Sequence, residues 1–341
     1  MSIDFHAHLA REDPNAPFFM RDLFDVEGYL EKQERAGIER TVLSFALEDE
    51  GDTMDEIKGE HDFLAGLLEQ YPDRFSALAA VDPFGGADAL AEGERALELG
   101  FTGFCFPTSR GGRYPDSADA ADAFALADEK GALVFLHPSA APIEPERAGH
   151  RLVNAWVGRP YDTGICLSRM LLADTLAGYP NIQMVVAHSG GTLPMLIGRL
   201  EHVFAGMKRM AAFAGGGPPG GGPPGGGGPP GGGGPPGGGG PPGADIPEEA
   251  KIQGEFEGRP LADRLHRISL DTASYHPAPI AAAIATVGID RIVLGTDFPP
   301  AGDSPDAAIA VLDHAGLSDE DKEKILTGNG RTLLEGAVQP A

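Results

Sequence analysis

The alternation of short apolar segments with amphipathic ones is the feature that most restricts the fold of this chain. Continuous apolar runs of strand length are typical of parallel strands that are covered on both faces. Eight such segments occur, at Ile3–His8, Arg40–Leu47, Phe75–Asp82, Phe101–Pro107, Leu133–His137, Ile182–His188, Ile268–Ala273 and Ile292–Asp297. Helical patterns separate and follow them, at Asp25–Ala36, Glu56–Gln70, Ala87–Leu99, Ser117–Lys130, Leu167–Ala177, Leu193–Ala211, Pro277–Val287, Asp306–Ala315 and Ser318–Glu335.

Eight strands that alternate with helices predict an α/β fold, a (β/α)8 barrel of the TIM type. We expect residues 1–341 to form this barrel as a single domain. A doubly wound open sheet has the same alternation and is the alternative architecture.

The segment 215–243 interrupts this pattern, because it contains only 19 glycines and 10 prolines. Its glycines do not recur at every third position, which excludes a collagen helix. It has no side chains that can fill a core, so we expect a disordered insertion between the sixth helix and the seventh strand. A tolerated repeat expansion is favoured over a partner-binding arm.

The charge balance excludes several classes of partner. The chain has 51 acidic and 26 basic side chains, a formal net charge of −25. A protein that binds nucleic acid or an anionic membrane surface needs a basic face instead. The sequence has no apolar run of membrane-spanning length and no secretory signal at its N-terminus. Two cysteines are too few for a disulfide framework, so we expect a cytoplasmic protein.

Polar side chains stand at the carboxyl ends of four predicted strands. His6 and His8 end the first strand, His137 the fifth, His188 the sixth and Asp297 the eighth. The active site of a parallel barrel lies at this end of its strands. Residues two apart in a strand point the same way, so His6 and His8 can share one divalent ion. A third histidine and a carboxylate would complete a nitrogen and oxygen site suited to zinc or a similar transition metal.

The motifs around these residues resemble a known family. Asp-Phe-His6-Ala-His8, Phe-Leu-His137-Pro-Ser, Val-Ala-His188-Ser-Gly-Gly and Leu-Gly-Thr-Asp297-Phe-Pro follow one another in this order. They are similar to motifs of the amidohydrolase superfamily, and most of all to its branch of aminocarboxymuconate semialdehyde decarboxylases. The resemblance continues through Trp156–Pro160 and His188–His202, and it covers nearly the whole chain except the Gly/Pro segment.

This resemblance implies a role for each motif. His6, His8, His137 and Asp297 would hold one divalent metal ion, with zinc as the first choice and manganese as the alternative. His188 would be the catalytic acid and base, with Asp297 beside it as a second catalytic residue. The fourth strand has no lysine that could be carbamylated as a metal bridge, which favours one ion over two. A homodimer is also implied, because enzymes of this branch often borrow an arginine from a neighbouring subunit.

The function that we expect is that of a metal-dependent carboxy-lyase acting on a small unsaturated or aromatic carboxylic acid. The metal would bind a substrate oxygen, and His188 would protonate the carbon that loses CO2. A hydrolase of a lactone, ester or amide would use the same site with a metal-activated water. A third hypothesis is a scaffold without catalysis, whose Gly/Pro segment binds a partner.

The sequence offers two choices for the group that holds the substrate carboxylate. Lys208 and Arg209 precede the Gly/Pro segment and are one choice. Arg110 and Arg113 follow the fourth strand and are another, although charges on such a loop are usually solvated.

Several other residues near strand ends are considered for structural or catalytic roles. We expect Asp82 and Asp271 to cap the turns that follow their strands, with orientation of metal-bound imidazoles as the alternative. His276 is a candidate for the pocket wall, and Trp156 suits the wall and the core equally. Cys105 has no evident base partner, so nucleophilic catalysis is not expected there.

Overall fold

The computed structural model describes residues 2–13, 18–47, 52–139, 142, 145–215, 260–302 and 304–337. Its eight strands form one sheet in which each strand pairs in parallel with the next. The strands are β1 Ser2–Ala7, β2 Ile38–Ser44, β3 Phe75–Ala80, β4 Gly103–Pro107, β5 Leu133–His137, β6 Gln183–Val186, β7 Ile268–Asp271 and β8 Ile292–Val293. The predicted barrel is therefore confirmed, whereas the expected disorder of 215–243 falls almost entirely outside the described residues.

The sheet closes into a barrel along a seam between β1 and the segment that follows β8. The amide of Asp297 donates to the carbonyl of His6 at 2.7 Å, and the amide of His8 donates to the carbonyl of Phe298 at 2.9 Å. These bonds place the first and the last strand side by side, although they lie at opposite ends of the sequence.

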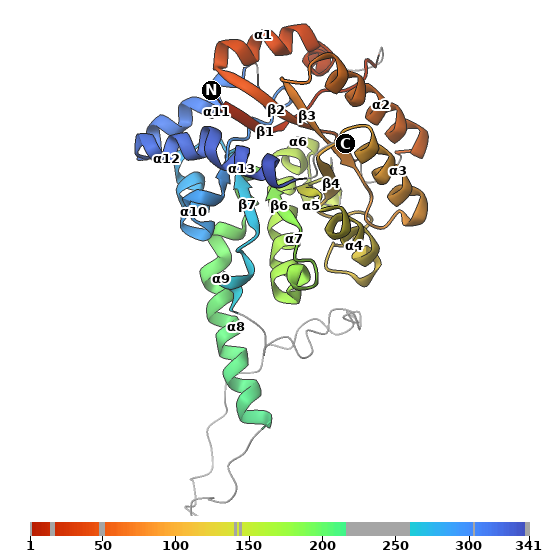
Figure 1. Ribbon diagram of the computed structural model, residues 1–341. Helices are drawn as coiled ribbons and strands as arrows, with labels where there is room; N and C mark the ends of the chain where they lie inside the picture. Colours follow the sequence, from red (N-terminus) through yellow and green to blue (C-terminus); the bar gives the residue numbers. More distant parts are fainter. Residues whose placement is uncertain are drawn as a thin grey trace, which may run out of the picture.

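Helices surround the strands (Figure 1). The α-helices are α1 Val26–Ala36, α2 Met54–Gln70, α3 Gly86–Glu98, α4 Ala121–Lys130, α5 Pro145–Ala148, α6 Arg151–Val153, α7 Arg159–Ala173, α8 Leu193–Gly215, α9 Leu261–Arg264, α10 Pro277–Val287, α11 Asp306–Ala310, α12 Asp319–Glu323 and α13 Asn329–Gly336. Shorter 3-10 turns are η1 Phe18–Leu23, η2 Ala118–Ala120, η4 Thr175–Gly178, η5 His188–Gly190, η8 Ile289–Arg291 and η9 Val311–His314, and π-helical turns are η3 Asn154–Gly158 and η10 Lys324–Gly328. Figure 1 shows α8 extending beyond the barrel. No helix in the described part of the chain is both long and apolar enough to cross a membrane.

The helix before β6 begins much earlier than the sequence predicts. We expected it to start at Leu167, but the chain is helical from Arg151 through η3 into α7. Gly158 and Pro160 resemble a loop signal because both residues disfavour a helix interior. In the wide turn of η3, the amide of Arg159 donates to the carbonyl of Asn154. Pro160, which has no N–H group to donate, follows at the point where the hydrogen-bond pattern changes from π-helical to α-helical.

Two layers of apolar side chains support the barrel. The larger layer lies between strands and helices, where Phe104 and Phe106 stack and Phe106 contacts Phe124 of α4. The second contains Cys105 and Phe135, which point into the barrel. The ring of Phe135 lies 5.1 Å from that of His6, so this layer forms the floor beneath the polar end of the barrel.

Candidate functional site

His6 and His8 project from the end of β1, and each is oriented through its Nδ1 atom. The His6 Nδ1 lies 2.6 Å from Oδ2 of Asp271, and the His8 Nδ1 lies 2.9 Å from the carbonyl oxygen of Ser44. Both partners are hydrogen-bond acceptors, so Nδ1 of each imidazole carries the proton. The Nε2 lone pairs are therefore available to a cation, as in metal sites where a second hydrogen bond fixes the histidine tautomer.

His137 ends β5 and completes a group of three neighbouring rings. Its ring centroid lies 5.0 Å from that of His6 and 5.1 Å from that of His8. Neither of its buried ring nitrogens has a hydrogen-bond partner. Burial and then the neighbouring imidazoles hold the pKa of His137 well below its usual value, so its neutral, metal-binding form is favoured.

His188 and Asp297 reach the same place from turns that follow β6 and β8. Both adopt left-handed backbone conformations, with φ angles of 56° and 49°. The sequence predicted both residues to lie on strands, but β6 and β8 end earlier, at Val186 and Val293. Non-glycine residues in this conformation store strain and concentrate at functional sites. The turns therefore direct both side chains into the barrel mouth.

The Asp297 carboxylate joins the histidines around one point. Its Oδ1 lies 3.3 Å from Nε2 of both His6 and His8, and its Oδ2 lies 3.4 Å from Nε2 of His188. Burial alone would raise the pKa of Asp297, but His6 and contacts with His188 and His8 hold it well below its usual value. The side chains of His8, His188 and Asp297 keep 11, 11 and 15% of their surface exposed, so the cluster is accessible from the barrel mouth.

This donor set fits a divalent cation. Ligand atoms of His6, His137, His188 and Asp297 all lie within 4.8 Å of one another. His6 Nε2, both ring nitrogens of His137 and His188 Nδ1 are buried without hydrogen-bond partners, which is costly unless another group satisfies them. All five side chains expected from the sequence are thus brought together, although the mutually close group contains His188 rather than His8.

Asp271 has a larger role than the turn cap that we expected. Its Oδ1 does accept from the amide of Ala273 at 3.1 Å, as a cap would. The same oxygen accepts from the amide of Ser189 at 2.8 Å, while Oδ2 holds His6. Asp271 therefore orients one histidine and fixes the turn that carries another. Asp82, in contrast, accepts from the amide of Phe84 and caps its turn as predicted.

The sequence analysis missed Asp4, two residues before His6. Asp4 is fully buried and accepts from Oγ1 of Thr296 at 2.6 Å and from the amide of Thr296 at 3.1 Å. Burial raises its pKa to about 7. These bonds tie β1 to the segment that precedes Asp297. The alternation that singled out His6 and His8 also places Asp4 on their face of the strand, which is the signal that would have found it.

The sequence suggested that Arg110 and Arg113 are solvated loop charges; this is wrong for Arg110, whereas Arg113 is exposed to solvent. The side chain of Arg110 is only 14% exposed and pairs with Asp82 at 3.1 Å and Asp52 at 3.6 Å. The guanidinium of Arg113 lies 4.5 Å from the ring centre of Phe84. Lys208 and Arg209 belong to α8, but their side chains are outside the described part of the structure.

The remaining candidates are exposed to solvent or chemically inert. Trp156 is 71% exposed, which excludes a core position, and His276 is exposed and caps α10 through its Nδ1. Burial raises the pKa of Cys105 to about 12, so its thiol stays protonated and does not act as a nucleophile.

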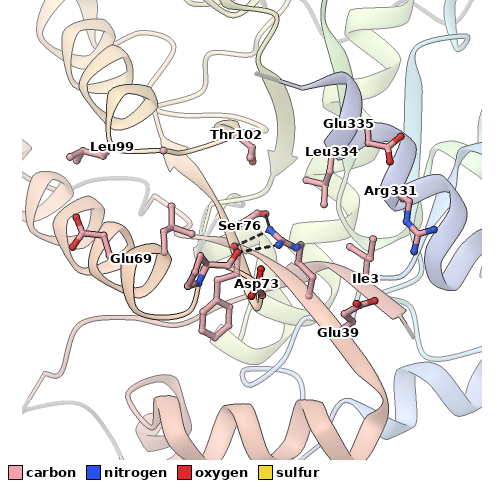
Figure 2. A pocket seen from close by; sticks show the side chains of 15 residues that line it. Ile3, Glu39, Glu69, Asp73, Ser76, Leu99, Thr102, Arg331, Leu334 and Glu335 are labelled. Atoms are coloured by element: carbon pink, nitrogen blue, oxygen red, sulfur yellow. Dashed lines mark hydrogen bonds between the residues drawn. The ribbon is translucent and has the colours of Figure 1, made fainter. Parts of the chain in front are cut away.

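A cavity of about 880 Å³ lies at the opposite end of the barrel, lined by residues such as Ile3, Arg40 and Ser76 near the amino ends of β1, β2 and β3. Figure 2 shows acidic side chains around it, including Glu39 and Asp73. None of the clustered histidines lines it, so it is separate from the candidate metal site.

A closed parallel barrel with a histidine and aspartate cluster at the carboxyl ends of its strands defines a class of metal-dependent barrel enzymes. Within that class, the chain belongs to the amidohydrolase family, because the family profile described as "Amidohydrolase" matches residues 3–335.

Curated relatives of this chain are named as decarboxylases. The 2-amino-3-carboxymuconate-6-semialdehyde decarboxylase of Dictyostelium discoideum is 29% identical over 159 residues, which cover 45% of this chain and 43% of that protein. The match thus spans less than half the length of this relative. The gamma-resorcylate decarboxylase of Polaromonas sp. is 23% identical over 346 residues, which cover 95% of this chain and 91% of that protein.

Solved structures share the fold over almost the whole chain. The 5-carboxyvanillate decarboxylase of Sphingomonas paucimobilis has a TM-score of 0.74 at 17% identity, with 98% of each chain covered. A dihydroxybenzoic acid decarboxylase of Polaromonas sp. JS666, solved with manganese and 2-nitroresorcinol, has a TM-score of 0.70 at 21% identity, with 98% of this chain and 96% of that chain covered.

Proposed function

We propose that this chain is a metal-dependent, non-oxidative decarboxylase of a small aromatic or unsaturated carboxylic acid. The observation that carries this proposal is the accessible cluster at the barrel mouth, where buried ring nitrogens without partners surround one carboxylate. The names of the relatives support the reaction class, since those from Dictyostelium and Polaromonas are both decarboxylases.

One divalent ion would be held by His6, His8, His137 and Asp297. His8 is included because the Ser44 carbonyl leaves its Nε2 lone pair facing Asp297. Zinc remains the first choice for this donor set, and the manganese in the Polaromonas structure supports the alternative. When bound, the ion would polarise a substrate oxygen and stabilise negative charge that develops on the substrate.

His188 would be the acid that completes the reaction, with Asp297 as its catalytic partner. Its hydrogen bond to Oδ2 of Asp297 places a proton on Nε2, the nitrogen that faces the cluster. The carbon–carboxylate bond breaks with its electron pair left on the substrate carbon, CO2 departs, and the imidazolium form of His188 gives its Nε2 proton to that carbon and becomes a neutral imidazole. Solvent then returns a proton to His188, so no oxidant or reductant is consumed. The bond from Ser189 to Asp271 keeps His188 in place during this transfer.

The test uses protein loaded with zinc or manganese and a panel of carboxylic acids that includes 2,6-dihydroxybenzoate and 5-carboxyvanillate. In D2O the product should carry one deuterium at the carbon that held the carboxylate, with stoichiometric release of CO2. The substitution His188→Asn should reduce turnover about 10²- to 10⁴-fold, the usual contribution of a positioned acid or base, while metal content stays unchanged.

Hydrolysis of a lactone, ester or amide is the competing reaction, because the family that the chain matches is described as "Amidohydrolase". Incorporation of ¹⁸O from labelled water into a product carboxylate, without release of CO2, would establish hydrolysis and exclude the lyase reaction.

We also propose a cytoplasmic homodimer in which residues 1–341 form one barrel domain with 215–243 as an insertion. Exposed apolar side chains on η3 and α8 support dimerisation, with Trp156 71%, Val157 60% and Met195 77% exposed. The two free, buried cysteines are consistent with a reducing compartment.

A further inference from the structure

A buried carboxylate that takes no part in the proposed reaction lies close to the site, in the first turn of α7. Asp162 is only 2% exposed. Its Oδ2 accepts from the hydroxyls of Thr108 at 2.5 Å and Ser109 at 2.8 Å, and its Oδ1 accepts from the hydroxyl of Tyr114 at 2.7 Å. All three donors come from the segment that follows β4, which we call the 108–114 segment.

The 108–114 segment also bonds to the backbone of His137. The amide of Thr108 donates to the carbonyl of His137 at 3.0 Å, and Pro107 lies opposite His137 in the pairing of β4 with β5. His6 and His8 are each held by a hydrogen bond to a ring nitrogen, whereas His137 has no such bond. The position of the His137 ring therefore depends on its backbone and on the contacts that hold that backbone.

The same turn of α7 touches the loop that carries His188. The amide of Thr192 donates to the carbonyl of Pro160 at 3.2 Å. A Cβ atom placed on Gly191 would lie only 2.1 Å from the Pro160 carbonyl oxygen, so the two backbones are in close contact. One helical turn thus contacts both the 108–114 segment and the turn with His188.

We propose that Asp162 is a positioning residue for this metal site. By fixing the 108–114 segment to α7, it holds the His137 carbonyl, and with it the imidazole, at a constant distance from His188. The inference rests on the proposed function for the metal and for His188. Hydrogen bonding rather than charge is the operative property, because all three partners are neutral hydroxyl donors.

Two substitutions and a control separate this role from a general contribution to folding. Asp162→Ala removes all three bonds. Asp162→Asn keeps an oxygen for Thr108 and Ser109 and offers an amide to the Tyr114 oxygen at almost the same size. The control is Glu92→Ala. Glu92 lies in α3 and is also buried, at 3% exposure. It bonds to His61 of α2 and to Arg95.

The readouts are hydrogen exchange in full-length protein loaded with Mn2+ and the rate at which excess EDTA removes that Mn2+. In Asp162→Ala we expect at least tenfold faster exchange of the Thr108 amide and about 10- to 100-fold faster loss of Mn2+, as for other residues that support metal ligands. Asp162→Asn should stay within about threefold of wild type on both measures, and Glu92→Ala should match wild type at the Thr108 amide and in Mn2+ loss.

Unchanged exchange at Thr108 or unchanged Mn2+ loss in Asp162→Ala would overturn the inference. So would an Asp162→Asn variant as impaired as Asp162→Ala, because that result would assign the effect to charge. Neither readout needs turnover. If both respond as expected but no carboxylic acid is decarboxylated, the proposed reaction fails while the positioning role of Asp162 stands.

Discussion

At the scale of single residues, Asp271 links the two halves of the candidate site. One oxygen of its carboxylate bonds to His6, and the other accepts from the amide of Ser189, next to His188. A metal ligand and the proton donor are therefore oriented by the same side chain. Gly295 packs against it, since a Cβ atom there would lie 2.7 Å from the Cβ of Asp271.

The first prediction follows from this double contact. Asp271→Asn should lower the affinity for the divalent ion about 10- to 100-fold, because an amide is a weaker acceptor for the His6 N–H and leaves its tautomer less well fixed. Competition with a chromophoric chelator measures this affinity. Asp82→Asn, two residues after the end of β3, is the matched control and should leave the metal affinity unchanged. Equal affinities in wild type and Asp271→Asn would contradict the role assigned to Asp271.

At the scale of elements, the turn after β6 requires glycine at position 191. Its φ of +61° is strained for other residues, and an added Cβ would collide with the Pro160 carbonyl oxygen of α7. Gly198, in α8, has open space around its Cβ position and a helical backbone.

The second prediction compares these two glycines. Gly191→Ala should lower stability by about 1–3 kcal/mol from backbone strain alone and should also reduce activity, because His188 is displaced. Gly198→Ala should be neutral or stabilising by up to about 1 kcal/mol, the difference in helix propensity. Urea unfolding monitored by circular dichroism gives both values. A Gly191→Ala protein as stable and active as wild type would show that the turn does not constrain His188.

The third prediction concerns His61, which joins α2 to α3 through a 2.7 Å bond from its Nδ1 to Glu92. Burial lowers the pKa of His61 below its usual 6.5, and Glu92 offsets this only in part. The folded state thus favours neutral His61, so its contribution to stability is present above pH 6.5 and is lost as the pH falls through the lowered pKa.

Calorimetry between pH 7 and pH 5 tests this sign. The melting temperature of wild type should fall with pH more steeply than that of His61→Asn, which keeps a donor for Glu92 but cannot be protonated. His314→Asn, at an exposed position, should follow wild type. Parallel curves for wild type and His61→Asn would refute the prediction.

The sequence predicts the elements and the donors well, and it fails where tertiary contacts override a local signal. The eight strands and the convergence of His6, His8, His137, His188 and Asp297 follow from apolar runs and strand-end positions. The start of this helical stretch at Arg151 does not follow from the sequence, because Gly158 and Pro160 indicate a loop and η3 accommodates them within a helix. The roles of Arg110 and Asp271 depend on partners far away in sequence, which periodicity cannot identify.

At the scale of the whole molecule, η3 and α8 expose large apolar side chains that a partner subunit would bury. Trp156 and Met195 are both more than 70% exposed, and large apolar groups exposed in this way are typical of protein interfaces. Trp156 lies in η3 and Met195 lies in α8. These segments are neighbours, because α7 continues η3 and contacts α8.

The fourth prediction tests the homodimer on this surface. Light scattering coupled to size-exclusion chromatography should give twice the 35.5 kDa chain mass for wild type. The double variant Trp156→Glu and Met195→Glu should elute as a monomer, because two buried carboxylates would oppose association. Leu99, the exposed C-cap residue of α3, offers a control, and Leu99→Glu should remain dimeric. A wild-type monomer at micromolar concentration would contradict the dimer.

The barrel seam also fixes when the site can exist during biosynthesis. His6 is made 291 residues before Asp297, whose amide bonds to the His6 carbonyl. At about 5–20 residues per second, this interval is on the order of 15–60 s. A nascent chain on the ribosome therefore carries His6 and His8 without Asp297 for this interval, and the full donor set can assemble only after the segment with Asp297 has left the exit tunnel and joined β1.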